Sequence, residues 1–334
     1  MHSDSGESSR PEATEAPGGS GPDLFGPEGE GVLEGDSLDL LERIPDGSVH
    51  LILSDIPYGI SADGWDVLHD NQNSALLGTS PAQQRAGAVF RRRGKPINGW
   101  SEADANIPRE YYDWCARWAR AWLRVLKPGG SAIVFAGRRL APRCVTALED
   151  AGFNFRDMLA WTRPQAVHRA QRLSVVFDRR GDADRARDWE GWRVGNLRPT
   201  FEPILWCFKP YRITIADNVV EHEVGAFNQD ALVQHFGGVD NVLACGLEPG
   251  EGGHHPTQKP LKLLRALVEL TTRPGHVVLD PFAGSGSTAV AAQEAGRRYL
   301  AIERDPAYCA VIRGRLQAAR QALDLSPGGA ARQT

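Results

Sequence analysis

Two short motifs, each following an apolar run of strand length, limit the folds open to this chain. The first, residues 54–60 with the sequence SDIPYGI, follows the run VHLIL at 49–53. The second, residues 280–288 with the sequence DPFAGSGST, follows another apolar run and leads into a predicted helix. Proline and glycine end a strand, and open α/β sheets bind ligands at the carboxyl ends of their strands. We therefore expect two adjacent pockets, one for a substrate and one for a cofactor.

The spacing of apolar residues predicts alternating strands and helices around these motifs. Strands are expected at 32–33, 49–55, 131–136, 153–161, 276–279 and 298–302. Helices are expected near 38–41, from Arg109 to a turn at 127–130, and over 141–151, 260–272, 287–295 and 306–323. This order favours an α/β fold with a parallel, doubly wound sheet. A stripe of Trp114, Trp118, Trp122 and Val125 is expected to pack in its core.

The composition changes along the chain and suggests how it is divided. Residues 1–29 are rich in Ser, Gly, Pro and Glu, which predicts a disordered tail, and residues 324–334 are expected to fray. The regular pattern covers 30–161, with an irregular basic loop at 61–106, and returns over 254–323. Between 162 and 253 the pattern fades, and we expect an inserted region there.

Basic residues gather in both irregular regions. The loop contains Arg91, Arg92 and Arg93, and the inserted region contains Arg169, Arg172, Arg193 and Arg198, interleaved with aromatic residues. Arginine beside tryptophan suits contact with phosphates and stacking on bases. A solvated loop and a partly ordered insertion with buried tryptophans explain the same pattern, so both interpretations stay open on these residues alone.

Composition narrows the function classes. The net charge is −4, with −6 in residues 1–30 and +2 in the remainder, so nucleic-acid affinity has to come from local basic patches. The five cysteines are scattered without a CxxC motif, which indicates buried apolar residues rather than a disulfide framework or a metal site. No apolar stretch approaches the roughly 20 residues of a membrane span, and no signal peptide is recognisable. We therefore expect a soluble, cytoplasmic protein.

The glycine-rich motif suggests a nucleoside ligand. It lacks the lysine of a P-loop and the third glycine of the dinucleotide pattern, where Ala289 stands. Glu303 ends the next predicted strand, where Rossmann-type folds place an acid for ribose hydroxyls. A helix N-terminus together with this acid fits an adenosine ligand that carries a carboxylate, such as S-adenosylmethionine (SAM). Taken alone, Glu303 is more simply a solvated acid at a strand end.

On these residues the chain resembles the amino-group DNA methyltransferases, which methylate adenine N6 or cytosine N4, in their permuted arrangement. Asp55-Ile56-Pro57-Tyr58 is similar to their Asp-Pro-Pro-Tyr motif, and 280–288 is similar to their Phe-x-Gly-x-Gly loop. Residues 255–260 resemble the segment that helps enclose SAM, and 35–37 resemble the segment that contacts its adenine. The resemblance covers about residues 31–323. It implies a SAM-methyltransferase (Rossmann-like) sheet, with target recognition in 162–253 and SAM binding in 254–323.

The resemblance also implies roles for individual residues. Asp55 and the carbonyl of Ile56 would accept hydrogen bonds from an exocyclic amino group, Pro57 would fix the turn, and Tyr58 would stack on a flipped base. The residues expected around SAM are Asp36, Ser37, Thr257, Lys259, Asp280, Phe282, Gly284, Gly286, Ser287, Thr288 and Glu303. The arginines named above would bind double-stranded DNA. No cysteine follows a proline, unlike the nucleophile of ring-carbon methyltransferases.

The sequence leaves one departure from the family and several alternatives. Ile56 stands where the family has its first proline, which restores a backbone N–H but keeps the carbonyl that the chemistry uses. An aspartate at the start of the motif favours adenine N6, with cytosine N4 as the alternative. Methylation of RNA and a non-catalytic SAM- or DNA-binding module are further interpretations. A restriction endonuclease is a candidate partner, and no metal is expected.

Overall fold

A computed structural model describes residues 30–58, 102–163, 170–251 and 258–324. The strands of its main sheet are β1 (Glu30–Glu34), β2 (Val49–Asp55), β3 (Leu126–Phe135), β4 (Asn154–Thr162), β7 (Phe201–Phe208), β8 (Val242–Ala244), β9 (Val277–Asp280) and β10 (Arg298–Glu303). Their spatial order is β1-β10-β9-β2-β3-β7-β4-β8. The six predicted strands all lie in this sheet, which confirms the α/β fold. The predicted tail at 1–29, most of the basic loop and the residues after 324 fall outside the described residues.

One strand runs against the others. β7 pairs antiparallel with both β3 and β4, whereas the other pairings of the sheet are parallel. The parallel sheet expected from the order of elements is therefore a mixed sheet. β7 and β8 both come from 162–253, where regular structure was expected to fade. The run 203–207 is buried throughout, so it shows none of the alternation that marks a strand with one solvated face.

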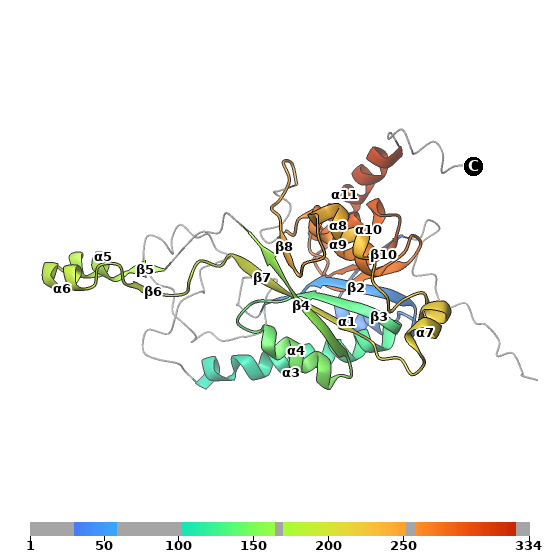
Figure 1. Ribbon diagram of the computed structural model, residues 1–334, viewed down its shortest axis with the longest axis horizontal. Helices are drawn as coiled ribbons and strands as arrows, with labels where there is room; N and C mark the ends of the chain where they lie inside the picture. Colours follow the sequence, from blue (N-terminus) through green and yellow to red (C-terminus); the bar gives the residue numbers. More distant parts are fainter. Residues whose placement is uncertain (1–29, 59–101, 164–169, 252–257, 325–334) are drawn as a thin grey trace, which may run out of the picture.

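Helices cover both faces of the sheet and give three layers (Figure 1). On one face, α1 (Ser37–Leu41), α3 (Glu102–Val125) and α4 (Ala141–Asp150) share an apolar core with the strands. On the other face, the core includes α8 (Gln229–Phe236), α9 (Leu261–Thr271), α10 (Ser287–Glu294) and α11 (Pro306–Asp324). Successive residues of a strand enter the two cores in turn, as Ile52 and Leu53 of β2 do.

The tryptophan stripe of α3 packs as predicted. Trp118 and Trp122 are 1% and 0% exposed, and Trp114 lies against the same core. α3 begins at Glu102, earlier than predicted, because the helix accommodates Pro108 in its interior. β3 also includes 127–130, which we expected as a turn. Backbone hydrogen bonds of 2.9 Å between these residues and Lys209, just beyond β7, extend the pairing there.

The cysteines are free thiols. Cys115, Cys144, Cys207 and Cys309 are buried and Cys245 is partly buried, which agrees with their interpretation as apolar residues. Within the described ranges, no group of His, Cys, Asp and Glu side chains is arranged to hold a metal ion. None of the helices in those ranges has both the length and the apolar character needed to cross a membrane.

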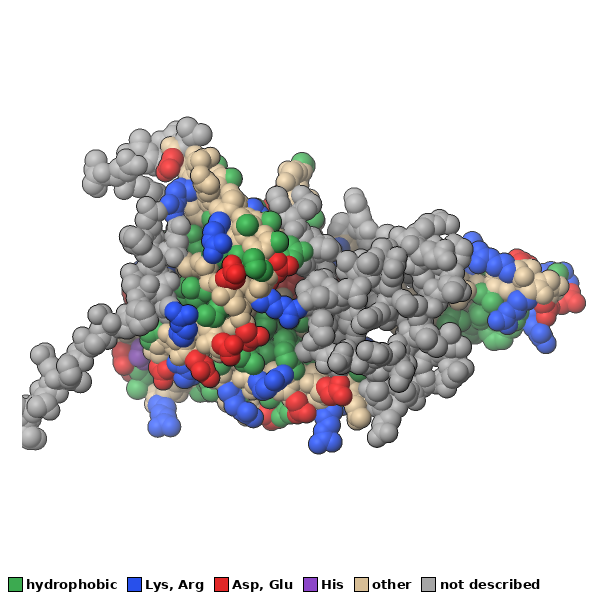
Figure 2. All heavy atoms as spheres, turned by 180° about the vertical axis from the view of Figure 1, so that it is seen from behind, with side chains coloured by type: hydrophobic (Ala, Val, Ile, Leu, Met, Phe, Trp, Pro, Cys, Tyr) green, Lys and Arg blue, Asp and Glu red, His purple; other side chains and the backbone are tan. Residues whose placement is uncertain are grey.

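An arm, residues 170–199, projects from one end of the molecule (Figure 1). It contains β5 (Gln171–Arg172), α5 (Leu173–Asp178), α6 (Ala183–Asp188) and β6 (Arg193–Val194), and β5 pairs antiparallel with β6. Figure 2 shows basic and acidic side chains side by side on this projection. Trp192 and Leu197 are 61% and 87% exposed. At the other end of the sheet lies α7 (Ile215–His222) (Figure 1).

Two histidines stack at the amino edge of the sheet. The rings of His50 in β2 and His276 before β9 lie 4.0 Å apart, and His50 Nδ1 accepts the Val277 N–H at 3.1 Å. Burial lowers the pKa of His50 from 6.5 to about 3, assisted by His276, Lys127 and Arg298. The His50 ring in the folded protein therefore stays neutral at pH values at which an exposed histidine is protonated.

This pair predicts how stability depends on pH. Between pH 6.5 and about 3, His50 is protonated in the unfolded chain but stays neutral in the folded protein. The free energy of unfolding therefore falls as the pH falls through this range. The loss is at most roughly 1.4 kcal/mol per pH unit. His50→Gln keeps an acceptor for the Val277 N–H but does not titrate. We expect urea unfolding of the variant between pH 7 and about 4.5 to show a shallower pH dependence than the parent; equal slopes would contradict this.

Candidate active site

The two sequence motifs meet at the carboxyl edge of the sheet. β2 and β9 are neighbouring parallel strands, with Ile52 opposite Leu279. At their ends, the Ser54 hydroxyl donates to Asp280 Oδ1 at 2.7 Å. Asp55 follows directly, so the two sequence motifs lie next to each other.

Five side chains form what we call the Asp55 cluster: Asp55, Tyr58, Arg163, Glu202 and Lys259. The single proton of the Tyr58 hydroxyl is shared between Asp55 Oδ1 at 2.8 Å and Glu202 Oε2 at 3.1 Å. The Lys259 ammonium donates to Asp55 Oδ2 and lies 3.7 Å from Glu202 Oε2. Arg163 pairs with Glu202 Oε1 at 2.6 Å. Two carboxylates therefore face two cations, brought together from β2, β4, β7 and the start of α9.

Burial shapes the electrostatics of this cluster. The Asp55 side chain is 26% exposed, and desolvation raises its pKa, while the Lys259 ammonium acts in the opposite direction. Lys259 is 4% exposed, and its ammonium also lies 5.3 Å from the ring centre of Phe135. Desolvation, followed by the charges of Asp55 and Glu202, holds the pKa of Tyr58 well above its usual value. The phenol therefore stays protonated and remains a donor.

The turn after β2 is held by packing. A Cβ at Gly137, just after β3, would come within 2.9 Å of Tyr58 Cβ, so a glycine there lets the tyrosine approach. The Tyr111 hydroxyl of α3 donates to the Pro57 carbonyl at 3.1 Å. Ile56 is 2% exposed and belongs to the core beneath α3. These contacts fix the direction in which the turn presents its side chains.

The loop between β9 and α10 carries the glycine motif. Gly286 adopts a φ of +78°, and a Cβ there would come within 2.8 Å of Ile312 in α11. Arg315 of α11 donates to the Ser285 carbonyl at 2.6 Å and to the Ser287 hydroxyl at 3.0 Å. The loop is thus braced from α11, and the N-terminus of α10 opens beside it.

Polar groups surround this loop. Glu303 ends β10 and accepts the Gly284 N–H at 2.8 Å. Because β1 pairs with β10, the Gly35 N–H reaches the Glu303 carbonyl at 3.0 Å, and Asp36 and Ser37 follow at the same edge. Ser37 Oγ is buried without a hydrogen-bond partner. This buried hydroxyl lies at the edge of the sheet that also carries Asp36 and Glu303, and it is available to a ligand with polar groups, such as a nucleoside.

Asp280 begins the glycine loop and holds it through hydrogen bonds. Burial raises its pKa to about 6, although hydrogen bonds from Ser54, Thr288 and the Phe282 N–H act in the opposite direction. The Phe282 ring lies 5.6 Å from that of Trp114 in α3. Both predicted residues therefore contact the protein interior, directly beneath the glycine loop.

Other predicted site residues lie apart or cannot be placed. Arg172, Arg193 and Arg198 are exposed on the arm and do not join the Asp55 cluster. The predicted contacts Arg91, Arg92, Arg93, Arg169 and Thr257 lie outside the described residues.

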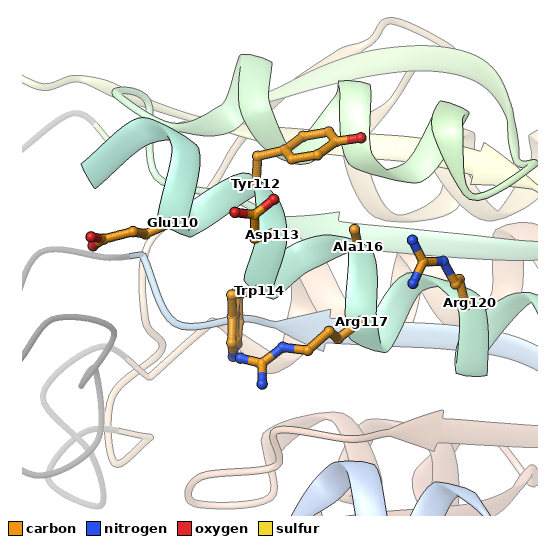
Figure 3. A pocket seen from close by; sticks show the side chains of 7 residues that line it. All are labelled: Glu110, Tyr112, Asp113, Trp114, Ala116, Arg117 and Arg120. Carbon is orange, nitrogen blue, oxygen red and sulfur yellow. The ribbon is translucent and has the colours of Figure 1, made fainter. Parts of the chain in front are cut away.

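A depression lined by side chains of α3 is a separate feature (Figure 3). Its lining is Glu110, Tyr112, Asp113, Trp114, Ala116, Arg117 and Arg120, all from one helix. It includes neither the Asp55 cluster nor the glycine loop, so the candidate active site is the sheet edge.

Sequence reasoning missed Arg163, Glu202 and Arg315. Glu202 precedes the apolar run 203–208, and Arg163 follows the predicted strand 153–161. That run was a signal for a strand. Its antiparallel direction, which brings Glu202 to the site, was not visible without the pairing partners.

Comparison with known protein families and relatives gives consistent matches. A family model for N6/N4 methyltransferases, described as DNA methylase, matches residues 49–314. The type II methyltransferase M.HindIII of Haemophilus influenzae is 50% identical over 281 residues, which are 82% of this chain and 91% of that protein. The type II methyltransferase M.HinfI of Haemophilus influenzae is 26% identical over 296 residues, 86% of this chain and 68% of that protein.

Solved structures share the fold. The cytosine-N4-specific PvuII DNA methyltransferase aligns with a TM-score of 0.56 at 18% identity, covering 87% of this chain and 90% of its own. The putative DNA modification methylase TTHA0409 of Thermus thermophilus, complexed with S-adenosyl-L-methionine, aligns with a TM-score of 0.54 at 20% identity, covering 87% and 94%. At these identities the likeness establishes the architecture.

The braced loop predicts a contrast between two glycine variants. Gly286 and Gly296 flank α10 with φ of +78° and +74°, but only Gly286 has a neighbour within 4 Å of an added Cβ. Both alanine variants carry the strain of a positive φ, about 1 kcal/mol. Gly286→Ala adds the clash with Ile312, about 1–3 kcal/mol more.

We expect Gly286→Ala to unfold at lower urea concentration than Gly296→Ala and to bind SAM more weakly, because the loop has to move. Gly296→Ala is expected to keep the SAM affinity of the parent in equilibrium binding. Equal SAM affinity of the two variants would show that the loop does not hold the cofactor.

Proposed function

This chain belongs to the N6/N4 DNA methylase family of SAM-dependent amino-methyltransferases, and we propose that it methylates adenine N6 in duplex DNA. The observation that carries the proposal is the turn of Asp55, Ile56, Pro57 and Tyr58, which lies beside the glycine loop through the pairing of β2 with β9. The 50% identity with a type II methyltransferase supports site-specific modification paired with a restriction endonuclease. Such a role places its action on DNA inside the cell.

We propose that SAM binds at the glycine loop. Glu303 would accept the ribose hydroxyls, Asp36 and Ser37 would meet the adenine, and the N-terminus of α10 would receive the carboxylate. The buried Ser37 Oγ, which has no hydrogen-bond partner, supports this arrangement. When bound, SAM supplies a sulfonium methyl group that is open to attack by an amine. Ser287 and Thr288 begin α10 and would lie at the carboxylate end of the ligand.

The target base would bind at the Asp55 cluster. An exocyclic amino nitrogen is a poor nucleophile because its lone pair is delocalised, and a paired base has to leave the duplex to be reached. Asp55 and the carbonyl of residue 56 would accept the two amino hydrogens and stabilise the positive charge that develops on nitrogen. The Tyr58 ring would stack on the flipped base, and Pro57 would fix the turn.

Ile56 is compatible with this chemistry. Its side chain is buried in the core beneath α3, where an apolar residue is favourable, and the change from proline leaves its carbonyl in place. The hydrogen bond from Tyr111 to the Pro57 carbonyl supplies rigidity on the other side of the turn. We infer that the departure from the family motif preserves activity.

We propose adenine rather than cytosine as the target base from the Asp55-Ile56-Pro57-Tyr58 motif alone. An aspartate starts the motif here, whereas a serine start would favour cytosine N4. Cytosine N4 is the second candidate, because the two amino groups present the same donors to Asp55. Incubating the protein with labelled SAM and mixed-sequence duplex DNA, followed by digestion to nucleosides, distinguishes N6-methyladenine from N4-methylcytosine. Absence of both would refute the proposal.

Asp55→Ala tests the site directly. Loss of the acceptor should lower methyl transfer at least about 10²-fold, the usual effect of removing a group that stabilises transition-state charge. SAM affinity should be unchanged, because the glycine loop is intact. The comparison variant Ile56→Pro restores the family motif and is expected to stay active. Retained turnover in Asp55→Ala would refute the assignment of the turn, and activity that appears only in Ile56→Pro would show that the natural chain is a binding module.

We propose that the arm contacts DNA. Arg172, Arg193 and Arg198 are exposed there, together with Trp192. Guanidinium groups suit phosphates and base edges, and an exposed indole suits a base. Arg187 on the same arm is already paired with Asp184, so its charge is compensated locally.

This pairing offers a matched control. We expect the double variant Arg172→Gln/Arg198→Gln to weaken DNA binding and to reduce the slope of log affinity against log salt by about 2, roughly one per lost phosphate contact. Arg187→Gln should change the slope less, because Asp184 already neutralises it. SAM affinity should not change in either variant. An unaltered slope in the double variant would exclude these arginines as phosphate contacts.

A further inference from the structure

Both carboxylate oxygens of Asp55 already have donors. The Tyr58 hydroxyl lies on Oδ1 at 2.8 Å, and the Lys259 ammonium lies on Oδ2. An amino group that comes to Asp55 has to displace or share one of these donors. The ammonium is the stronger competitor, because its bond to the carboxylate is charge-assisted.

A displaced ammonium needs another acceptor. Lys259 is only 4% exposed, so its cation cannot be hydrated without a large rearrangement. A buried cation that is separated from its carboxylate is destabilised, and the expected response is a move towards a nearby carboxylate. Glu202 Oε2 is 3.7 Å from the ammonium and belongs to a side chain that is itself only 14% exposed.

Glu202 is held in a position to receive it. Arg163 occupies Oε1 at 2.6 Å, which leaves Oε2 facing the other members of the cluster. The same oxygen accepts the Tyr58 hydroxyl at 3.1 Å. Glu202 is therefore within reach of both donors that now occupy Asp55.

The backbone reinforces this placement. β7 runs antiparallel, so its first residues lie at the edge where the parallel strands end. Glu202 sits opposite Trp161 of β4, and the Arg163 N–H donates to the Thr200 carbonyl at 2.8 Å. The carboxylate is thus fixed from two strands rather than carried on a free loop.

Resting on the function proposed above, we propose that Glu202 is a positioning residue that takes the Lys259 ammonium and the Tyr58 hydroxyl from Asp55 when the target amino group binds. Asp55 then has an oxygen for the substrate, and the cation stays paired. The charge of Glu202 is the essential property. An amide of the same shape accepts the phenol hydrogen bond but holds an ammonium only weakly.

The test is Glu202→Gln in the full chain, with unmethylated duplex DNA and labelled SAM. Because Lys259 then stays on Asp55, the rate of a single turnover at saturating DNA should fall about ten- to a hundredfold, the range for losing a hydrogen bond between charged groups. SAM affinity and the KM for DNA should be those of the parent, whereas the midpoint of thermal unfolding should fall, because Arg163 loses its charged partner. Glu149→Gln, an exposed glutamate of α4, is the control and should leave the rate unchanged.

Lys259→Gln supplies a second measurement. Alone it should slow the reaction, because Asp55 loses its counter-ion. Combined with Glu202→Gln it should add no further loss, since the proposed task of Glu202 is to hold that cation. Losses that multiply would overturn the proposal, as would a Glu202→Gln defect found in SAM affinity or thermal unfolding instead of in the rate.

Asp55→Ala, measured in parallel, distinguishes failure of the proposed role of Glu202 from failure of the assigned active site. If Asp55→Ala is inactive and Glu202→Gln turns over at the parent rate, the site assignment stands and the role of Glu202 is refuted. If Asp55→Ala remains active, the site assignment and this proposal both fail.

Discussion

The pairing of β2 with β9 in the middle of the sheet is the contact on which the site depends. The Ser54–Asp280 hydrogen bond at the end of these strands joins residues 226 positions apart in the chain. Closing so long a loop is entropically unfavourable, and it is offset by burial of apolar side chains from both strands, such as Leu53 and Val278, in a common core. Neither half of the chain contains the site by itself. The turn after β2 and the glycine loop after β9 are brought side by side only when the whole sheet has formed.

Two acids at this edge, the buried Asp280 and the partly exposed Asp55, differ in their surroundings, and the difference suits their proposed roles. Asp280 accepts hydrogen bonds from the Ser54 and Thr288 hydroxyls and from the Phe282 N–H, and burial raises its pKa to about 6. Asp55 is also desolvated, but Lys259 opposes the rise and favours the ionised carboxylate. An acceptor that has to stabilise a developing positive charge benefits from being ionised, whereas an acid that anchors a loop functions through hydrogen bonds in either state. The counter-ion of Asp55 is also its competitor for the substrate, which is why a second carboxylate nearby matters.

The sequence predicted the regular parts of this protein well and the assembly of the site only in part. Local periodicity predicts the strands at 49–55 and 298–302 and the tryptophan stripe of α3. The fold has these elements where the periodicity places them. The glycine loop and Asp55 were found because strand-end chemistry has a recognisable order in sequence. The role of Glu202 could not be predicted in this way, because Glu202 lies near the start of an antiparallel strand. The rule that ligands bind at carboxyl ends applies to parallel strands. The role of Arg315 could not be predicted either, because it depends on how α11 packs against the glycine loop, and no short motif encodes that packing.

The position of the arm explains how recognition and chemistry can share one sheet. The arm is inserted between β4 and β7, which are adjacent and antiparallel, so it emerges as an enlarged hairpin connection. Extra residues at such a connection leave the strand register undisturbed, because the pairing of Thr162 with Phe201 closes the hairpin below them. Arg163 and Glu202 lie at the two sides of that base and bond to each other. The residue that we propose to relieve Asp55 therefore stands where the arm joins the sheet, and a chain that changed its arm would still keep the Asp55 cluster intact.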